Sequence, residues 1–147
     1  MASRDARSNG GRGGTSGPDE IALEQHFDRD DLYALRAAVA AHAAHLGAPP
    51  ERVAHVVIVA SELASNAVRH GGGGGRLRLW RTDGRVCCEV RDAGPGLADP
   101  GAGTVPPSTL APGGRGLWIV RRLATDVRIE SGGYGTQVTA VLPLDPA

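Results

Sequence analysis

The chain has 147 residues and a mass of 15.1 kDa, a size that suits one folded domain. Its 16 basic and 16 acidic residues balance, which argues against a general polyanion-binding surface and so against direct nucleic-acid binding. No apolar run reaches the roughly 18 residues of a membrane span, and the first residues lack the hydrophobic segment of a secretory signal. The sequence therefore predicts a soluble, cytoplasmic protein with no membrane partner.

All 16 basic residues are arginine, because the chain contains no lysine. A Walker A loop, the phosphate-pairing lysine of ordinary protein kinases and a Schiff-base lysine are therefore excluded. The two cysteines, Cys87 and Cys88, are adjacent and lack the Cys-x-x-Cys spacing of a metal site. We interpret them as small strand residues in a reducing compartment.

Periodicity and turn residues divide the chain into elements. Alternating apolar and polar residues indicate strands, apolar spacings of three and four indicate helices, and glycine, proline and aspartate mark the ends of both. In the first half of the chain the patterns predict a disordered tail at 1–18, an edge strand at 19–26, a helix from a capping Asp30 or Asp31 to about 46, and a helix from Pro49-Pro50 to about 70. In the second half they predict hairpin strands at 76–81 and 85–91, a long loop at 97–112, a third helix at 116–124, and closing strands at 126–130 and 137–142.

The order β-α-α-ββ-α-ββ favours an α+β protein, because its helices do not alternate singly with strands. We expect a two-layer α/β sandwich in which helices cover one face of a mixed sheet. Alternation within the hairpin strands indicates that the other face of the sheet is wet or only thinly covered. The domain is expected to span 19–143, followed by a short tail at 144–147.

The second helix carries a line of polar residues beside its apolar stripe. Glu62, Asn66 and Arg69 are spaced i, i+4 and i+7, which places them on one side of a helix, well away from the apolar residues. Such a line is most often the solvent-facing side of an amphipathic helix. The glycine-rich segments that follow it in the sequence favour a functional role.

Two glycine clusters lie at the ends of predicted elements. Asp92-Ala-Gly94-Pro-Gly96 follows a strand, where glycines let the backbone approach a flat ligand and the carboxylate can accept from an exocyclic amine such as that of adenine. Gly113-Gly114-Arg115-Gly116 opens the third helix, whose free N–H groups and positive dipole end form an anion site. Each cluster alone is a weak signal, but their order after a helix with Glu and Asn four apart is much more specific.

These segments resemble the motifs of the GHKL superfamily of ATP-binding domains, which includes gyrase, Hsp90, MutL and the histidine kinases. The stretch from Glu62 to Gly71 resembles the N box, and the segments 92–97 and 114–120 resemble the two glycine boxes. Gly135-Thr136 before the last strand resembles the terminal adenine-pocket threonine. The resemblance covers roughly residues 19–143. Within the superfamily, the chain more specifically resembles the bacterial anti-sigma-factor serine kinases.

The resemblance implies a role for each matching residue. Asn66 would bind a Mg²⁺ that bridges the phosphates of ATP, and Glu62 would be the general base for the attacking hydroxyl. Asp92 would accept from the adenine amine with support from Thr136. Arg115 is either a γ-phosphate contact in place of the missing lysine or an exposed surface residue. The other implied nucleotide-binding positions are Gly94, Gly96, Gly114, Gly116 and Leu117.

Length selects among the relatives, because a lone domain leaves no room for the dimerisation helices of a histidine kinase or for a transducing domain. Resemblance to the anti-sigma branch implies an ATP-dependent serine/threonine protein kinase in bacterial transcription control. Such a kinase binds a sigma factor and phosphorylates an anti-sigma antagonist. The resemblance is also compatible with a homodimer. The alternative is a non-catalytic ATP-binding module that sequesters a sigma factor or another regulator. Glu62 favours the kinase, because ATP binding alone needs no general base.

Overall fold

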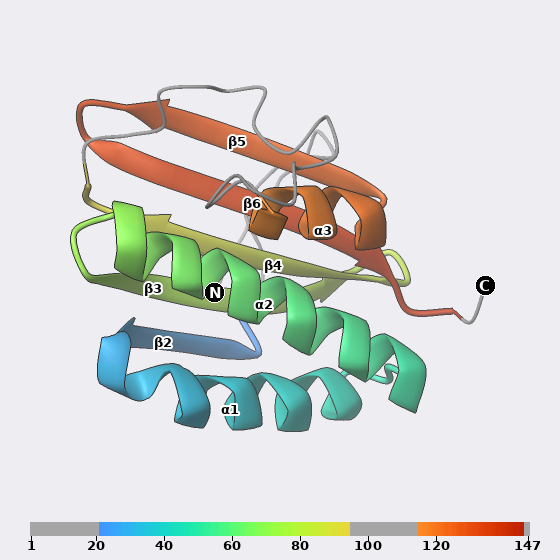
Figure 1. The fold of residues 1–147 in the computed structure, drawn as a ribbon. Helices are drawn as coiled ribbons and strands as arrows, with labels where there is room; N and C mark the ends of the chain where they lie inside the picture. Colours follow the sequence, from blue (N-terminus) through green and yellow to red (C-terminus); the bar gives the residue numbers. More distant parts are fainter. Residues whose placement is uncertain (1–20, 95–114, 146–147) are drawn as a thin grey trace, which may run out of the picture.

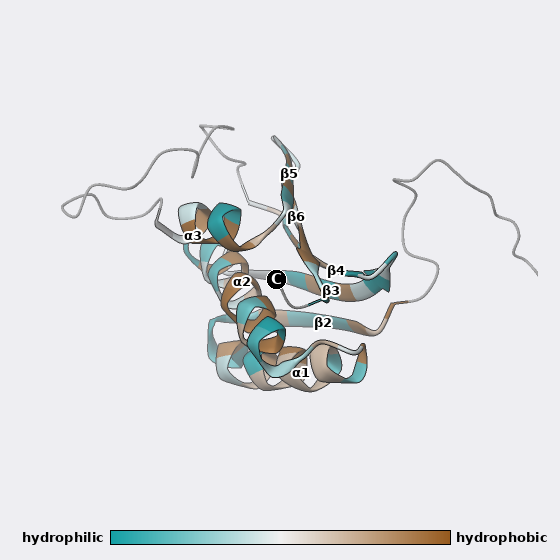
Figure 2. Ribbon diagram, turned by 90° about the vertical axis from the view of Figure 1, so that its right-hand side faces the viewer, coloured by the Kyte–Doolittle hydropathy of each residue, from teal (hydrophilic) through white to brown (hydrophobic). Residues whose placement is uncertain are grey.

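The computed structural model describes residues 21–94 and 115–145, which form one sheet with helices on one of its faces (Figures 1 and 2). The expected tail at 1–18 and the whole of the expected loop at 97–112 lie outside these residues. The described elements are β2 (Leu23–Asp28), the 3-10 turn η1 (Arg29–Asp31), α1 (Leu32–His45), α2 (Pro50–His70), β3 (Gly74–Thr82), β4 (Arg85–Asp92), α3 (Arg115–Leu123), β5 (Asp126–Gly132) and β6 (Gly135–Pro143).

The predicted α+β, two-layer architecture is confirmed, but the expectation of a mixed sheet is wrong. The strand order is β2-β3-β4-β6-β5, and every pairing among the described residues is antiparallel. Two helices in succession lie between β2 and β3, so the chain reverses three times and these neighbouring strands run in opposite directions (Figure 1). β4 and β5 do run parallel, since both are antiparallel to β6, but β6 lies between them and they never pair.

The first strand and its cap differ from the sequence prediction. The strand begins at Leu23 and continues to Asp28, two residues beyond the predicted end, so that Phe27 enters the core. Asp31 stands at the N-cap position of α1, as predicted, but its side chain makes no cap hydrogen bond there. The side-chain cap lies on η1 instead, where Asp28 Oδ1 accepts from Asp30 N at 2.9 Å and Asp31 Oδ2 accepts from Asp28 N at 2.9 Å. This reciprocal pair satisfies two backbone donors where the strand turns into the helix.

The core lies between the sheet and the helices. In α1, Leu35, Val39 and Ala43 are buried at spacings of four, as in the apolar pattern by which the sequence predicts a helix. In α2, the buried residues include Val56, Val59, Leu63 and Val68. In the hairpin strands, the buried core residues follow the predicted alternation: Leu77, Leu79, Val86, Cys88 and Val90. α2 crosses β3, β4 and β6 and so ends beside the strand that carries the first glycine cluster.

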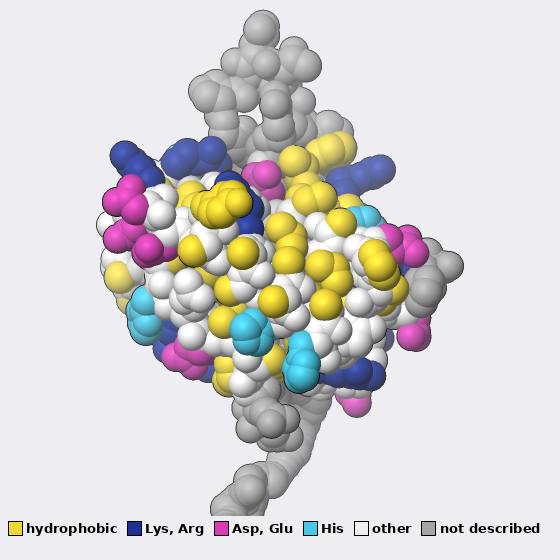
Figure 3. Space-filling model, turned by 90° about the horizontal axis from the view of Figure 1, so that it is seen from below, with side chains coloured by type: hydrophobic (Ala, Val, Ile, Leu, Met, Phe, Trp, Pro, Cys, Tyr) yellow, Lys and Arg dark blue, Asp and Glu magenta, His cyan; other side chains and the backbone are white. Residues whose placement is uncertain are grey.

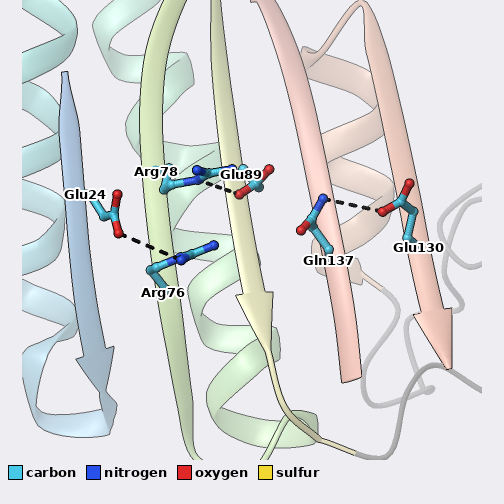
Figure 4. A network of polar contacts seen from close by, with 6 residues as sticks. All are labelled: Glu24, Arg76, Arg78, Glu89, Glu130 and Gln137. Carbon is cyan, nitrogen blue, oxygen red and sulfur yellow. Dashed lines mark hydrogen bonds and ion pairs between the residues drawn. The ribbon is translucent and has the colours of Figure 1, made fainter. Parts of the chain in front are cut away.

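None of the described helices covers the other face of the sheet (Figure 2), and charged side chains pair across its strands (Figure 4). Arg78 Nε donates to Glu89 Oε1 at 2.8 Å, and this bond raises the pKa of the guanidinium. Glu89, Trp80 and Cys87 are nonetheless buried, and Trp80 and Cys87 lie outside the main core cluster. The sequence pattern predicted a wet or thinly covered face, whereas the middle of this face is buried.

The first helix is apolar on its outer side as well, which is unusual for a surface helix. Tyr33 is 83% exposed, and alanines occupy many of the other exposed positions of α1. The view from below shows apolar side chains scattered over this part of the surface (Figure 3). No described helix is long and apolar enough to cross a membrane.

The ordered fold continues past the boundary predicted at residue 143. Leu144 is buried and its N–H donates to Gly84 O at 3.0 Å. Arg52 in the first turn of α2 donates from Nε to Asp145 O at 2.9 Å. The first contact ties the end of β6 to the turn between β3 and β4, and the second ties it to the start of α2.

Candidate functional site

The polar line of α2 is present as predicted and faces the start of α3. Glu62 and Asn66 are half-buried, whereas Arg69 is exposed. Arg69 Nη2 donates to Asn66 Oδ1 at 2.9 Å, so the amide oxygen expected to bind Mg²⁺ already has a cationic neighbour. The sequence placed Arg69 on this line but did not reveal this contact, because i, i+3 spacing allows several partners.

The first turn of α3 packs closely on that line. A methyl group on Gly116 would lie 2.8 Å from Glu62 Oε1 and 3.6 Å from Asn66 Oδ1. A Cβ at this position would force the end of the Glu62 side chain to shift, whereas its distance to Asn66 Oδ1 is an ordinary van der Waals contact. The N-terminus of α3, where backbone N–H groups and the helix dipole favour an anion, therefore adjoins Glu62 and Asn66.

A second group of polar atoms gathers around the Asp92 carboxylate at the end of β4. Asp92 and Thr136 are directly paired residues of β4 and β6. Asp92 Oδ1 accepts from Gly94 N at 2.9 Å and from Thr136 N at 3.3 Å, while the Thr136 hydroxyl shares a 2.9 Å hydrogen bond with Ser131 Oγ. The structure thus brings the predicted carboxylate, threonine and first glycine together.

Three glycines pack tightly against Asp92 or against one another beside it, and two of them, Gly71 and Gly135, were not among the predicted site residues. An added Cβ on Gly71 would lie 2.3 Å from Asp92 Cγ, and one on Gly135 would lie 2.1 Å from Asp92 O. One on Gly94 would lie 2.5 Å from Gly71 Cα. Gly71 follows α2 directly and could have been found from the sequence, as the residue after the polar line.

The two groups are joined by the last turn of α2. Asn66 and Gly71 are five residues apart, which corresponds to about 7.5 Å of helix rise. A cleft of about 690 Å³ adjoins the Asp92 end, and its walls include Gly71 and Asp92. Its volume falls within the range of small-molecule sites.

The remaining predicted residues lie outside this arrangement or outside the described part of the chain. Gly96 and Gly114 are not among the described residues, and Arg115 is described only as the first residue of α3. Leu117 is buried in the core cluster. Among the described residues, no group of three or more His, Cys, Asp or Glu side chains could hold a metal ion.

The free cysteines play no part in the site. Both thiols are buried, and burial raises the pKa of Cys88 to about 12. A thiol that keeps its proton throughout the physiological range is neither a nucleophile nor a metal ligand. The sequence prediction of structural strand residues agrees with this environment.

Comparison with known proteins identifies the fold and the family. Residues 26–142 match the histidine kinase-like ATPase domain. The structure resembles the RsbU and RsbW domains of Rv1364c from Mycobacterium tuberculosis, with a TM-score of 0.60 and 24% identity over 83% of this chain and 32% of that chain. No curated protein sequence matches significantly.

Two histidine kinase structures show the same fold. The histidine kinase domain of the Erythrobacter litoralis EL346 blue-light-activated kinase has a TM-score of 0.54 and 24% identity over 77% of this chain and 65% of that chain. The mycobacterial sensor histidine kinase MprB has a TM-score of 0.53 and 19% identity over 85% of this chain and all of that chain. The chain spans only about a third of the RsbU–RsbW structure.

The fold and the paired glycine and polar motifs are those of a GHKL ATP-binding domain, as the sequence indicated. The chain belongs to the histidine kinase-like ATPase domain family. The chain is thus a domain of an ATP-binding family.

Proposed function

We propose that this domain binds Mg-ATP and transfers the γ-phosphoryl group to a serine of a partner protein. The observation that carries the proposal is the division of the site into two ends. Glu62 Oε1 and Asn66 Oδ1 both face Gly116 at the start of α3, and Asp92 and Thr136 meet at the other end. A nucleotide has the same division into a charged end and a base.

At the base end, Asp92 has the chemistry to select adenine. Oδ1 is occupied by two backbone N–H donors, so Oδ2 is the oxygen left to accept from the exocyclic amine. Guanine presents a carbonyl at that position, and two facing acceptors repel. ATP is therefore expected to bind at least ~30-fold more tightly than GTP, which corresponds to about 2 kcal/mol.

At the phosphate end, the available atoms are oxygens, the donors that Mg²⁺ prefers. Asn66 Oδ1 would hold the ion, with Glu62 close enough to bind one of its waters. When bound, Mg²⁺ neutralises charge on the phosphates. Arg69, which donates to Asn66 Oδ1, would exchange that contact for a phosphate oxygen, because a guanidinium pairs well with both.

Glu62 is the proposed general base. The serine Oγ would attack the γ-phosphorus, the bond from that phosphorus to the bridging oxygen would break, and ADP would leave. The Glu62 carboxylate would take the hydroxyl proton, an effect worth typically 10²–10⁴-fold in rate. Its half-buried position beside the N-terminus of α3 suits that role.

The proposed protein partners are a sigma factor and an anti-sigma antagonist that carries the serine, in the bacterial cytoplasm. The motif resemblance to anti-sigma-factor kinases supports this assignment, as does the structural likeness to a chain that contains an RsbW domain. Zero net charge supports a protein partner over nucleic acid.

The decisive experiment compares Glu62→Gln with a matched control, Glu51→Gln, in the exposed first turn of the same helix. Partners are first recovered by a pull-down with and without Mg-ATP, and transfer is then followed with radiolabelled ATP. Glu62→Gln should bind ATP and partner normally but transfer phosphate at least ~100-fold more slowly. Glu51→Gln should behave like the wild type.

Two outcomes would change the proposal. Unimpaired transfer by Glu62→Gln would remove the general-base role. A wild-type protein that binds its partner only with ATP but transfers nothing would instead be a passive sequestering module.

A further inference from the structure

The helices that flank the proposed phosphate end, α2 and α3, lie side by side (Figure 1). They run in opposite directions. α3 begins at Gly116 beside Glu62, and just after it ends Thr125 N donates to Val141 O, near the end of β6. The chain at that end of β6 also contacts the start of α2, where Arg52 donates to Asp145 O.

This antiparallel packing brings two isoleucines together. Ile58 lies one turn before Glu62 on α2, and Ile119 lies one turn after Gly116 on α3, so both are at the same level of the helix pair. Ile58 is 40% exposed and Ile119 is half-buried, which places both on the solvent side of the contact between the helices. They therefore border the opening through which a protein substrate would reach Glu62.

An exposed apolar side chain at this place is unusual for the protein. Within the described ranges, only three large hydrophobic residues are exposed: Ile58, Tyr33 on α1 and Tyr134 in the turn between β5 and β6. The surface beside the proposed general base is thus one of few where an apolar side chain of another protein could be covered.

Arg122 gives the same surface a positive charge that no described residue neutralises. It shares one face of α3 with Trp118 and Ile119, at spacings of four and three. Its guanidinium lies over the Trp118 ring at 5.3 Å, is exposed, and makes no ion pair or hydrogen bond within the part of the chain that the structure describes. α3 contains no acidic residue, and Asp126, which follows it, pairs with Arg128 at 3.3 Å. A guanidinium over an indole keeps its in-plane N–H groups free for a carboxylate.

We propose that Ile58, Trp118, Ile119 and Arg122 form a docking rim for the substrate protein, and that the rim selects a serine flanked by apolar and acidic residues. The inference rests on the proposed kinase function, because it names the segment on which that function would act. An apolar side chain of the segment would cover the two isoleucines, and a carboxylate would pair with Arg122. Surface tryptophan and arginine are the residue types that most often dominate such contacts.

The experiment uses the full chain, with and without Mg²⁺ and a non-hydrolysable ATP analogue, and three end-capped synthetic peptides. The first carries Asp-Leu-Ser-Leu-Asp, the second replaces both Asp by Lys, and the third replaces both Leu by Gly. Binding is followed by acrylamide quenching of tryptophan fluorescence. Trp118 is half-buried and Trp80 is only 8% exposed, so a bound peptide should protect mainly Trp118.

Two variants test the two chemical parts of the rim. Arg122→Glu should weaken binding of the aspartate peptide at least ~10-fold and strengthen binding of the lysine peptide, which loss of structure would not do. Its control is Arg85→Glu, since Arg85 is exposed on the uncovered face of the sheet. Ile58→Ser should weaken the aspartate peptide about 5-fold and leave the glycine peptide unchanged, with Tyr33→Ser as its control.

A wild-type protein that prefers the aspartate peptide, and an Arg122→Glu protein that prefers the lysine peptide, would support the rim. Equal affinity for both peptides, protection that never saturates, or the same effect from Arg122→Glu and Arg85→Glu would overturn it. Phosphate transfer is measured separately. A protein that discriminates among the peptides but transfers no phosphate would refute the kinase and not the rim, so the two failures are distinguishable.

Discussion

Replacing Gly71 with alanine tests whether the Asp92 carboxylate is held in place by the close approach of α2. The added Cβ would lie 2.3 Å from Asp92 Cγ and 2.4 Å from Oδ2. Gly71 has φ of −111°, so alanine brings no backbone strain of its own. Since carbon atoms pack at about 3.5 Å or more, the carboxyl group must move by roughly 1 Å.

The displacement breaks two hydrogen bonds to Asp92 Oδ1, from Gly94 N at 2.9 Å and from Thr136 N at 3.3 Å. Bonds to a charged acceptor are worth about 1.5–3 kcal/mol each, and partial exposure and the longer distance favour the lower end. The substitution of glycine by alanine also raises the unfolding free energy by about 0.4–1 kcal/mol, because it lowers the conformational entropy of the unfolded chain. We expect a net loss of about 2 kcal/mol in unfolding free energy, or roughly 4–10 °C in Tm.

The assays are thermal unfolding and calorimetric titration with ATP and GTP. ATP affinity should fall about 30-fold, and its preference over GTP should shrink, because Oδ2 no longer meets the adenine amine. Gly133→Ala is the control, since a Cβ there meets no atom within 4 Å. If Gly71→Ala unfolded at the same Tm as the wild type and bound ATP with the same affinity, the reasoning would be refuted. In an Asp92→Ala background, Gly71→Ala should cost little further ATP affinity.

Three further predictions concern other contacts. Gly116→Ala should push Glu62 aside and lower phosphate transfer at least ~10-fold, with little change in Tm because the contacted atom ends a flexible side chain. Arg78→Met should lower the unfolding free energy by about 3 kcal/mol in urea titrations, because it leaves the buried Glu89 carboxylate unpaired. The Cys88 thiol has a pKa of about 12 in the folded protein and about 9 in the unfolded chain, so ionisation favours the unfolded chain above pH 9. The unfolding free energy should therefore fall from pH 9 upward, by about 2 kcal/mol at pH 10.5, as measured by urea titrations.

Each of these has a contradicting result. Full transfer in Gly116→Ala would show that Glu62 is not needed at its observed position. An Arg78→Met protein as stable as the wild type would show that Glu89 finds water instead. Cys88→Ala should lose the alkaline fall in stability; if it does not, the fall has another origin.

The features that the sequence predicted well are those that local periodicity determines. The face of α1 that carries Leu35 and Val39 follows from their spacing along one helix. The polar line of Glu62 and Asn66 follows in the same way from positions four residues apart. The two-layer architecture follows from the order of such elements, because an amphipathic helix needs an apolar sheet face to cover.

The features that the sequence did not predict depend on contacts between distant segments. The position of β6 between β4 and β5, which makes the sheet antiparallel, is set by pairings that no local pattern encodes. The contact of Gly71 with Asp92 joins residues 21 positions apart. Trp80 and Cys87 occupy alternating outward positions, yet both are buried, and the Arg78 guanidinium lies over the Trp80 ring at 5.7 Å.

The hydrogen bonds of Asp92 and Asn66 show that one end of the candidate site is already arranged for a ligand, whereas the other end must change its hydrogen bonding first. Asp92 is already fixed by Gly94 and Thr136, so a base could dock there without rearrangement. Asn66 Oδ1 is engaged by Arg69 and must change partner before it can bind a metal. A nucleotide would then associate base first, and ADP and ATP would arrive equally fast. Any preference for ATP over ADP would have to arise after docking, when Arg69 exchanges Asn66 Oδ1 for a phosphate oxygen. The preference would therefore appear as a slower dissociation of ATP than of ADP.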